Sequence, residues 1–161
     1  TVDTIRAMRD GRVRFFLGMG GNFLKAAPDT AVTEAALRSC AMTVQVSTKL
    51  NHSHLAPGRT AIILPTLGRS DLDVQRTGRQ RVTVEDSMSM VHASSGHLQP
   101  PAKDLLSEIA IVCRLARALF HDADGTPRPG SPQADWQAME DDYRLIRRHI
   151  EAVVPGFVDY E

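Results

Sequence analysis

Short apolar runs alternate with helical patterns in the first part of the chain, and this alternation limits the folds available to it. Val13–Leu17, Met42–Val46 and Ala61–Leu64 each predict a strand, and glycine, proline or polar residues follow each run. Between the first two runs, Pro28-Asp29-Thr30 offers turn and N-cap chemistry for a helix of about ten residues. This strand-helix-strand order predicts an α/β fold with a mostly parallel sheet flanked by helices.

The rest of the chain is less regular and ends in a helical segment. Gly and Arg residues without apolar periodicity predict a surface loop over 67–81, and Val82–Val84 predicts one more short strand. Apolar residues at three- and four-residue spacing predict helices over 105–120 and 134–154. We therefore expect an α/β domain over 1–120, a linker over 121–133 and a C-terminal helix within 134–161.

Charge and composition exclude several classes of partner. The 19 Lys and Arg residues balance 19 Asp and Glu residues, whereas a nucleic-acid or acidic-membrane surface usually needs a basic excess. No apolar run reaches the length of a membrane span, and the first residues lack the pattern of a signal peptide. Cys40 and Cys113 each lie in an apolar helical pattern, which favours two buried free thiols and a cytoplasmic location.

A glycine-rich segment follows the first predicted strand, and it is the strongest candidate for a ligand contact. Gly18, Gly20, Gly21 and Asn22 lie where a strand leads toward a helix. Glycine lets the backbone approach a ligand and turn its N–H groups toward an anion such as a pyrophosphate. The spacing differs from the G-x-G-x-x-G pattern of ordinary dinucleotide folds, so NAD is not expected. The same glycines also suit a tight turn without a ligand.

Other groups of polar residues do not form a catalytic constellation. His52 and His54 could share one face of an extended segment, but a third metal ligand at credible spacing is missing, so we predict no metal site. Hydrogen bonding to the backbone or to a ligand is the favoured role of these histidines. A hydrolase that uses Ser94 or Ser95 with His97 is disfavoured, since neither serine matches G-x-S-x-G. No catalytic residue is therefore predicted.

Several motifs in order resemble the third domain of the molybdopterin-dependent oxidoreductases, the superfamily of formate dehydrogenase and dimethyl sulfoxide reductase. The formate-dehydrogenase-like alpha subunits are the closest in appearance. The resemblance covers about residues 1–120. It rests on Gly-Gly-Asn-Phe at 20–23, on Val-Gln-Val-Ser-Thr-Lys-Leu-Asn at 44–51, and on later stretches that begin at Val84, Gly96 and Ser107. The resemblance implies a Rossmann-like α/β domain that holds one half of a bis(molybdopterin guanine dinucleotide) cofactor with molybdenum.

The resemblance also assigns roles to particular positions. It implies that the glycine-rich turn faces the pyrophosphate, that polar residues after the second strand face the guanosine or phosphates, and that a later acidic segment closes the pocket. Carboxylates suit the N–H edge of guanine, and lysine suits phosphate oxygens. Phe23 replaces a proline that is common in the family, and Val46-Ser47 replaces a common Asp. The implied cofactor-binding residues are Gly18, Gly20, Gly21, Asn22, Gln45, Ser47, Thr48, Lys49, Glu85, Asp86 and Ser87.

A complete enzyme of this kind needs parts that this sequence does not supply. Two cysteines in apolar patterns provide neither an iron–sulfur cluster motif nor an evident metal ligand. We therefore expect one domain of a larger oxidoreductase, inactive in isolation, whose partners are the remaining domains of the same polypeptide and an electron-transfer partner. The alternative is a free-standing nucleotide-binding or scaffold module without redox chemistry.

Overall fold

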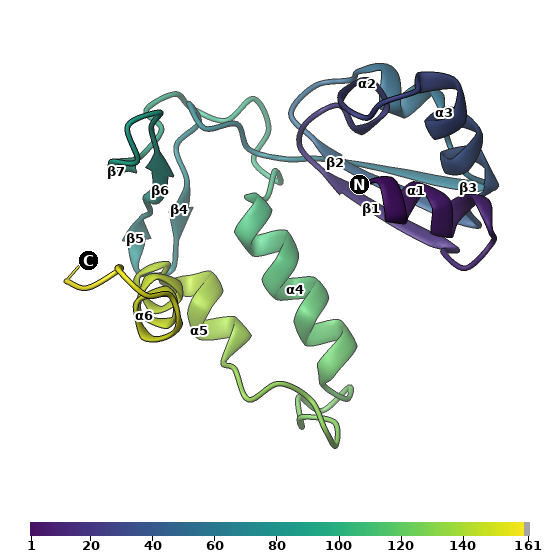
Figure 1. The fold of residues 1–161 in the computed structure, drawn as a ribbon. Helices are drawn as coiled ribbons and strands as arrows, with labels where there is room; N and C mark the ends of the chain where they lie inside the picture. The colour runs from purple at the N-terminus through teal and green to yellow at the C-terminus, as the bar shows by residue number, and fades with distance from the viewer. Residues whose placement is uncertain (160–161) are drawn as a thin grey trace. The chain divides into compact units, whose positions relative to one another are not determined.

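Three parallel strands, β1 (Phe15–Met19), β2 (Met42–Ser47) and β3 (Thr60–Pro65), form one sheet in the order β1-β2-β3 (Figure 1). This computed structural model describes residues 1–159. The chain forms two compact units, Thr1–Thr66 and Leu67–Glu161, and the sheet belongs to the first. The sheet confirms the α/β prediction and the parallel pairing. The central strand β2 has five buried residues among six, whereas all six residues of β3 are exposed.

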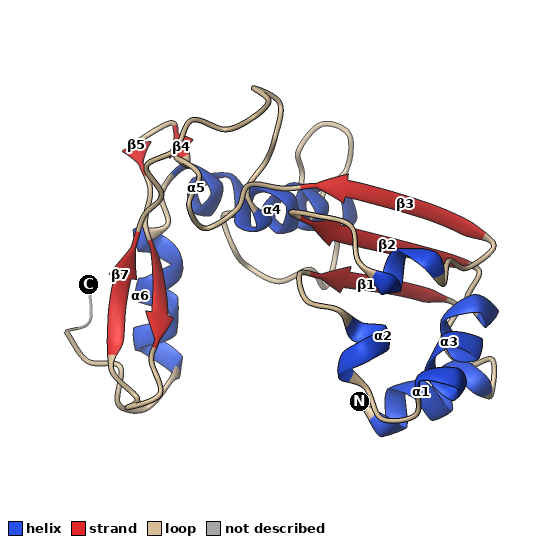
Figure 2. Ribbon diagram, turned by 90° about the horizontal axis from the view of Figure 1, so that it is seen from above, coloured by secondary structure: helices blue, strands red, loops and turns tan. Residues whose placement is uncertain are grey.

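The helices of this N-terminal unit lie beside its sheet (Figure 2). They are α1 (Val2–Arg9), α2 (Phe23–Ala26), α3 (Thr30–Ser39) and the 3₁₀-helix η1 (His52–Leu55). The side chains of Met8, Leu37 and Cys40 are fully buried in the apolar cluster between them. Asp29 accepts a hydrogen bond from the Val32 N–H at 3.1 Å, which confirms the predicted N-cap of α3.

Strand β1 lies two residues later than the sequence pattern predicts, and this changes the place of Gly18. Gly18 and Met19 pair with Gln45 and Val46 of β2, so Gly18 lies inside the strand rather than in the turn after it. A Cβ atom on Gly18 would lie 2.7 Å from Gln45 Oε1. A larger residue here would therefore have to displace the end of the Gln45 side chain.

Within residues 67–159, the C-terminal unit combines two antiparallel hairpins with three helices. The predicted loop over 67–81 contains a two-residue hairpin, and Val82–Val84 pairs with the Ser, Met and His-rich stretch that follows it. The predicted helix over 105–120 begins three residues later than expected, at Glu108. The elements are β4 (Val74–Gln75), β5 (Gly78–Arg79), β6 (Val82–Glu85), β7 (Val91–Ser94), α4 (Glu108–Phe120), α5 (Trp136–Asp141) and α6 (Arg144–Val153).

The single helix predicted over 134–154 is divided into α5 and α6. Asp142 has extended backbone angles, φ −148° and ψ 104°, and its carboxylate accepts a hydrogen bond from the Arg144 N–H at 3.0 Å. The Tyr143 N–H donates to Gln80 Oε1 at 3.0 Å instead of to a helical carbonyl. Both bonds stabilise a break that an apolar spacing cannot reveal. Residues 160 and 161, the end of the predicted helical segment, lie outside the described residues.

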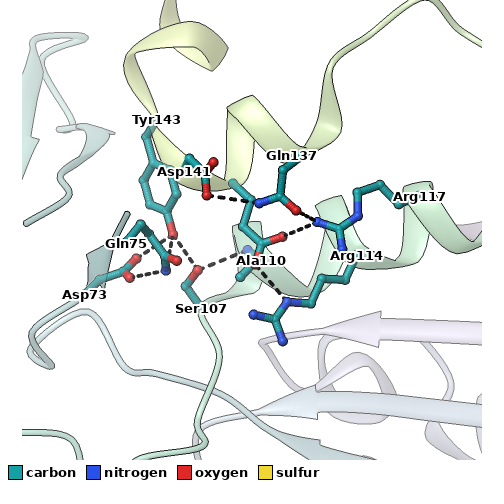
Figure 3. A network of polar contacts seen from close by, with 10 residues as sticks. Asp73, Gln75, Ser107, Ala110, Arg114, Arg117, Gln137, Asp141 and Tyr143 are labelled. Carbon is teal, nitrogen blue, oxygen red and sulfur yellow. Dashed lines mark hydrogen bonds and ion pairs between the residues drawn. The ribbon is translucent and has the colours of Figure 1, made fainter. Parts of the chain in front are cut away.

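Polar contacts fill much of the interior of the C-terminal unit (Figure 3). The Tyr143 hydroxyl, in a side chain that is 2% exposed, lies 2.6 Å from Asp73 Oδ2 and 2.6 Å from Ser107 Oγ. Glu140, which is 4% exposed, accepts hydrogen bonds from Arg114 at 2.8 Å and Arg117 at 3.2 Å. These contacts join residues that lie more than 20 positions apart. Buried charges and hydroxyls therefore connect α4, α5 and the hairpin segment.

The division between the compact units falls at Thr66–Leu67, inside the segment that the sequence analysis treats as one domain. Residues 123–125 and 128–134 have neither helix nor strand, and His121 and Pro127 form an isolated bridge. The predicted domain limits of 1–120, 121–133 and 134–161 stay a prediction.

Candidate functional site

The glycine-rich turn lies at the carboxyl end of the parallel sheet. The Gly20 N–H donates to the Val46 carbonyl at 2.8 Å, which holds the end of β1 against β2. Gly20 and Gly21 both have positive φ angles, +64° and +61°, a conformation that favours glycine. Apart from its own chain neighbours, no heavy atom of the described residues lies within 4 Å of the position that a Cβ on Gly21 would take. The turn therefore presents backbone with open space beside it, at the edge where ligands bind in open α/β sheets.

Two residues of the segment after β2 hold this turn in place, and the sequence analysis did not select them. Asn51 Nδ2 donates to the Gly21 carbonyl at 2.7 Å. Ser53 Oγ donates to Asn22 Oδ1 at 3.0 Å and accepts from the Leu24 N–H at the same distance. Asn22 is also the N-cap of α2, since its Oδ1 accepts from the Lys25 N–H at 3.4 Å. Ser53 is 1% exposed, so its hydrogen bonds to Asn22 and Leu24 lie in the interior of the unit.

Gln45 and His54 each carry a buried side-chain nitrogen of the N-terminal unit that has no hydrogen-bond partner among the described residues. The Gln45 side chain is 6% exposed, and its buried nitrogen is Nε2. Its Oε1 lies against the Cα of Gly18, where a Cβ would collide with it. A buried amide without a partner costs about 1–3 kcal/mol, so such a group in a native fold calls for an explanation. An acceptor atom of a bound ligand would supply one.

The remaining predicted contacts of the N-terminal unit lie at the end of β2. Ser47 is buried as the last residue of the strand, and its carbonyl accepts from the Thr66 N–H at 3.3 Å. Thr48 and Lys49 follow it and are exposed. The unit carries eight Lys and Arg residues against four Asp and Glu residues. Its positive balance, with Lys49 at the carboxyl edge, favours a negatively charged ligand.

Glu85, Asp86 and Ser87 lie in the C-terminal unit, at the turn between β6 and β7. Glu85 ends β6, and all three residues are exposed. Asp86 Oδ2 lies 2.7 Å from His92 Nε2, and Asp86 Oδ1 accepts from the N–H groups of Met88 and Met90. The His92 contact and these backbone bonds lower the pKa of Asp86. Asp86 thus stabilises its own turn. That Glu85, Asp86 and Ser87 close a cofactor pocket together with the glycine turn stays a prediction.

The histidines after β2 make a backbone contact. The Asn51 N–H donates to His54 Nδ1 at 3.0 Å, which completes a capping box at the start of η1. The same Nδ1 atom lies 3.2 Å from the Asn51 carbonyl oxygen, and Nε2 is buried with no hydrogen-bond partner among the described residues. No group of three or more His, Cys, Asp or Glu residues within 1–159 is placed to hold a metal ion. Backbone hydrogen bonding, the favoured role in the sequence analysis, is confirmed for His54.

Both cysteines are free and buried, as predicted. Burial raises the pKa of the Cys40 thiol. Burial also raises the pKa of Cys113, and the negative charge of Glu140 adds to this effect. Thiols with raised pKa values are poor nucleophiles at neutral pH, so a structural role suits both. Among the helices of residues 1–159, none combines the length and apolar character needed to cross a membrane.

The chain is similar to proteins that are named oxidoreductases. It is 62% identical over 160 residues to uncharacterized oxidoreductases of Mycobacterium tuberculosis and Mycobacterium bovis, a match that covers 99% of this chain and 20% of each relative. It is 45% identical over 159 residues to protein YdeP of Escherichia coli K12, with the same coverage of both. No family model matches the chain. The chain therefore spans about a fifth of the length of the curated relatives it matches.

Proposed function

We propose that this chain is the part of a larger molybdopterin-dependent oxidoreductase that binds a guanine dinucleotide. The oxidoreductase names of the relatives support the reaction class, and the fivefold greater length of those relatives supports a site completed by other domains. The finer assignment, to a formate-dehydrogenase-like molybdenum enzyme, rests on the ordered motifs of the sequence. The free thiols fit the proposed cytoplasmic location.

The residues at the carboxyl edge of the sheet suit the nucleotide end of such a cofactor. Gly20 and Gly21 would bring backbone N–H groups toward the pyrophosphate, and Lys49 would contribute positive charge. Gln45 Nε2 would donate to an oxygen or nitrogen of the nucleotide. The bound molybdenum cofactor would supply two-electron redox chemistry, which no residue of this chain supplies. The role of these side chains is to bind and orient the nucleotide.

The observation that carries the proposal is the Gln45 amide, which is buried beside a strand glycine and whose Nε2 has no partner within residues 1–159. A purely structural sheet gains nothing from a buried glutamine at this position, because an apolar side chain would avoid the cost of the unpaired amide. A polar ligand at the same edge removes that cost. The neighbouring glycine turn suits a phosphate, so a nucleotide is a ligand that fits both the turn and the Gln45 amide.

The test uses the natural polypeptide that carries this chain and compares two glycines at opposite ends of β1. Gly11 and Gly21 have similar φ angles, +71° and +61°, and open space around a built Cβ. Asparagine tolerates this conformation, so Gly21→Asn and Gly11→Asn impose similar backbone strain. We expect Gly21→Asn to lose most of the bound molybdenum, measured by inductively coupled plasma mass spectrometry, and Gly11→Asn to retain it.

Two results would contradict the proposal. The first is a natural protein without molybdenum or a pterin nucleotide, which would favour the free-standing nucleotide-binding or scaffold module. The second is equal molybdenum content in both variants, which would mean that the turn does not face the cofactor. A matched thermal-unfolding measurement shows whether either variant has lost its fold.

A further inference from the structure

The loop after α4 and the start of α5 form a hollow of about 760 Å³ in the C-terminal unit. Two side chains of its wall, His121 and Trp136, come from different segments. Each carries a buried ring nitrogen, Nδ1 and Nε1 respectively, without a hydrogen-bond partner among the described residues. We propose that this hollow is the docking site for an extended, uncharged segment of the same natural polypeptide, from outside the present chain.

Trp136 carries a nitrogen that can only donate. It is the one tryptophan of the sequence and the first residue of α5. Its side chain is half-buried and stacks on the Phe120 ring, with 6.1 Å between the ring centroids and 26° between the planes. This stacking fixes the direction of the indole N–H. A buried indole N–H usually has an acceptor, because an unpaired donor out of reach of water costs free energy.

His121 carries the second nitrogen, at the junction of α4 and the loop. It is the C-cap residue of α4, and its backbone N–H donates to the Arg117 carbonyl at 3.0 Å. His121 also forms an isolated bridge with Pro127, which fixes its backbone. The Nδ1 atom of a neutral histidine donates or accepts according to the tautomer. Trp136 and His121 together therefore require one acceptor and one further hydrogen-bonding group of either kind.

The charged side chains of the wall have partners within the unit. Arg117 donates to Glu140 at 3.2 Å, and Asp122 lies 3.0 Å from Arg128. Asp135 accepts a backbone N–H at 2.9 Å as the N-cap of α5. The buried groups that lack a partner within residues 1–159 are an indole and an imidazole, not a carboxylate or a guanidinium. This favours an uncharged occupant over an ion.

A peptide segment supplies what the two nitrogens lack. A peptide group has a C=O acceptor for Trp136 and an N–H donor for an accepting His121. Pro127, Pro132 and Ala134 add apolar surface to the wall, against which side chains of an extended segment can pack. Grooves lined by aromatic residues bind extended peptides by this combination of contacts.

The length of the relatives identifies the source of the segment. The chain spans 20% of the mycobacterial oxidoreductases to which it is 62% identical, so about four fifths of such a polypeptide lies outside it. A segment of the same polypeptide has a high effective concentration at the hollow, so a modest intrinsic affinity is enough for docking. Docking of this kind requires neither molybdenum nor the glycine turn.

The experiment is photo-cross-linking within the natural polypeptide. Gln133, an exposed residue of the wall, is replaced by the photoreactive amino acid p-benzoylphenylalanine, and mass spectrometry identifies the peptide that it captures. The control places the same probe at Lys103, which is exposed and outside the wall. We expect position 133 to capture one peptide from outside this chain. Position 103 should not capture that peptide.

Two variants then test the ring nitrogens. Trp136→Phe keeps an aromatic ring beside Phe120 but removes the N–H donor, and His121→Phe removes Nδ1. Each should lower the yield of the cross-link from position 133 by about threefold or more, because a hydrogen bond to the segment is lost. His149→Phe is the matched control for His121→Phe, since His149 is exposed and outside the wall, and it should leave the yield unchanged.

Three results would overturn the proposal. They are a position 133 that captures no more peptide than position 103, capture only of this chain or of a separate molecule, and equal yields in the wild type, Trp136→Phe and His121→Phe. Thermal unfolding identifies a variant that has lost its fold, and the captured peptide and the other variant then decide. The captured peptide is scored separately from molybdenum content, so failure here is distinguishable from failure of the proposed function.

Discussion

The two compact units are stabilised by different kinds of interior. In the N-terminal unit, aliphatic and sulfur-containing side chains such as Met8, Leu37 and Cys40 fill the space beside a parallel sheet. In the C-terminal unit, buried side chains include Glu140 and Tyr143, which hydrogen-bond across long separations in sequence. Apolar contacts are non-directional and tolerate small shifts, whereas buried polar contacts need matched partners. We therefore expect the N-terminal unit to lose stability mainly when buried apolar volume is removed. We expect the C-terminal unit to lose stability mainly when a buried hydrogen-bond partner is removed.

The largest expected effect is the loss of volume at Leu37, whose side chain is fully buried. Leu37→Ala should lower the free energy of unfolding of the N-terminal unit by about 2–5 kcal/mol, because it removes buried methyl groups and leaves a cavity. Hydrogen exchange of peptides from residues 1–66, followed by mass spectrometry, measures this loss. Leu50→Ala is the control, since Leu50 is 70% exposed. Similar losses in both variants would contradict an apolar interior at this position.

A smaller but pH-dependent effect is expected at Tyr143. Tyr143→Phe keeps the ring but leaves Asp73 and Ser107 without a shared hydroxyl, which should cost about 1–3 kcal/mol. Hydrogen exchange of peptides from α5 and α6 reports the change. If the variant is as stable as the wild type, the polar network does not stabilise the C-terminal unit.

Tyr143 also makes the stability of the C-terminal unit depend on pH in the alkaline range. Burial, followed by the hydrogen bond to Asp73, raises the pKa of Tyr143. A raised pKa in the folded state means that the stabilisation is complete below the ordinary tyrosine pKa of about 10 and is lost as the pH rises above it. The wild type should thus lose stability above pH ~10 more steeply than Tyr143→Phe. Thermal unfolding at increasing pH checks this, and parallel curves would contradict it.

The smallest effect concerns Asn22, a half-buried polar residue of the N-terminal unit. Asn22→Ala removes the acceptor of the Lys25 N–H and the Ser53 hydroxyl and should cost about 1 kcal/mol. Asn22→Asp keeps the acceptor, so its stability should stay close to that of the wild type. The aspartate also adds a negative charge beside the proposed phosphate turn, and it should reduce molybdenum retention in the natural polypeptide. Equal retention would argue against an anion at this turn.

Local sequence patterns predicted the N-terminal unit well. Three apolar runs and the Asp29 cap correspond to the strands of the sheet and to α3, because strand and helix periodicity and capping act over a few residues. The glycine turn was also visible in the sequence. The roles of Asn51 and Ser53 were not, since their partners Gly21 and Asn22 lie about 30 positions away.

The C-terminal unit shows where local patterns fail. In α4 the larger side chains of Val112 and Leu119 are 42% and 54% exposed, whereas the small residues Ala110, Cys113 and Ala116 are buried. The inward face of α4 packs against α5. At the edges of this face, Arg114 and Arg117 donate hydrogen bonds to Glu140. Small residues permit this close approach, which a hydrophobicity pattern does not record.

By itself, the sequence determined the α/β class, the parallel strands and the position of the glycine turn, because each depends on the spacing of a few neighbouring residues. The tertiary structure alone decided the break between α5 and α6 and the burial of the Gln45 amide without a partner among the described residues. Each of these depends on side chains that the fold brings together from distant positions. Polar partners are chosen by distance and direction in space, and periodicity along the chain carries no record of either.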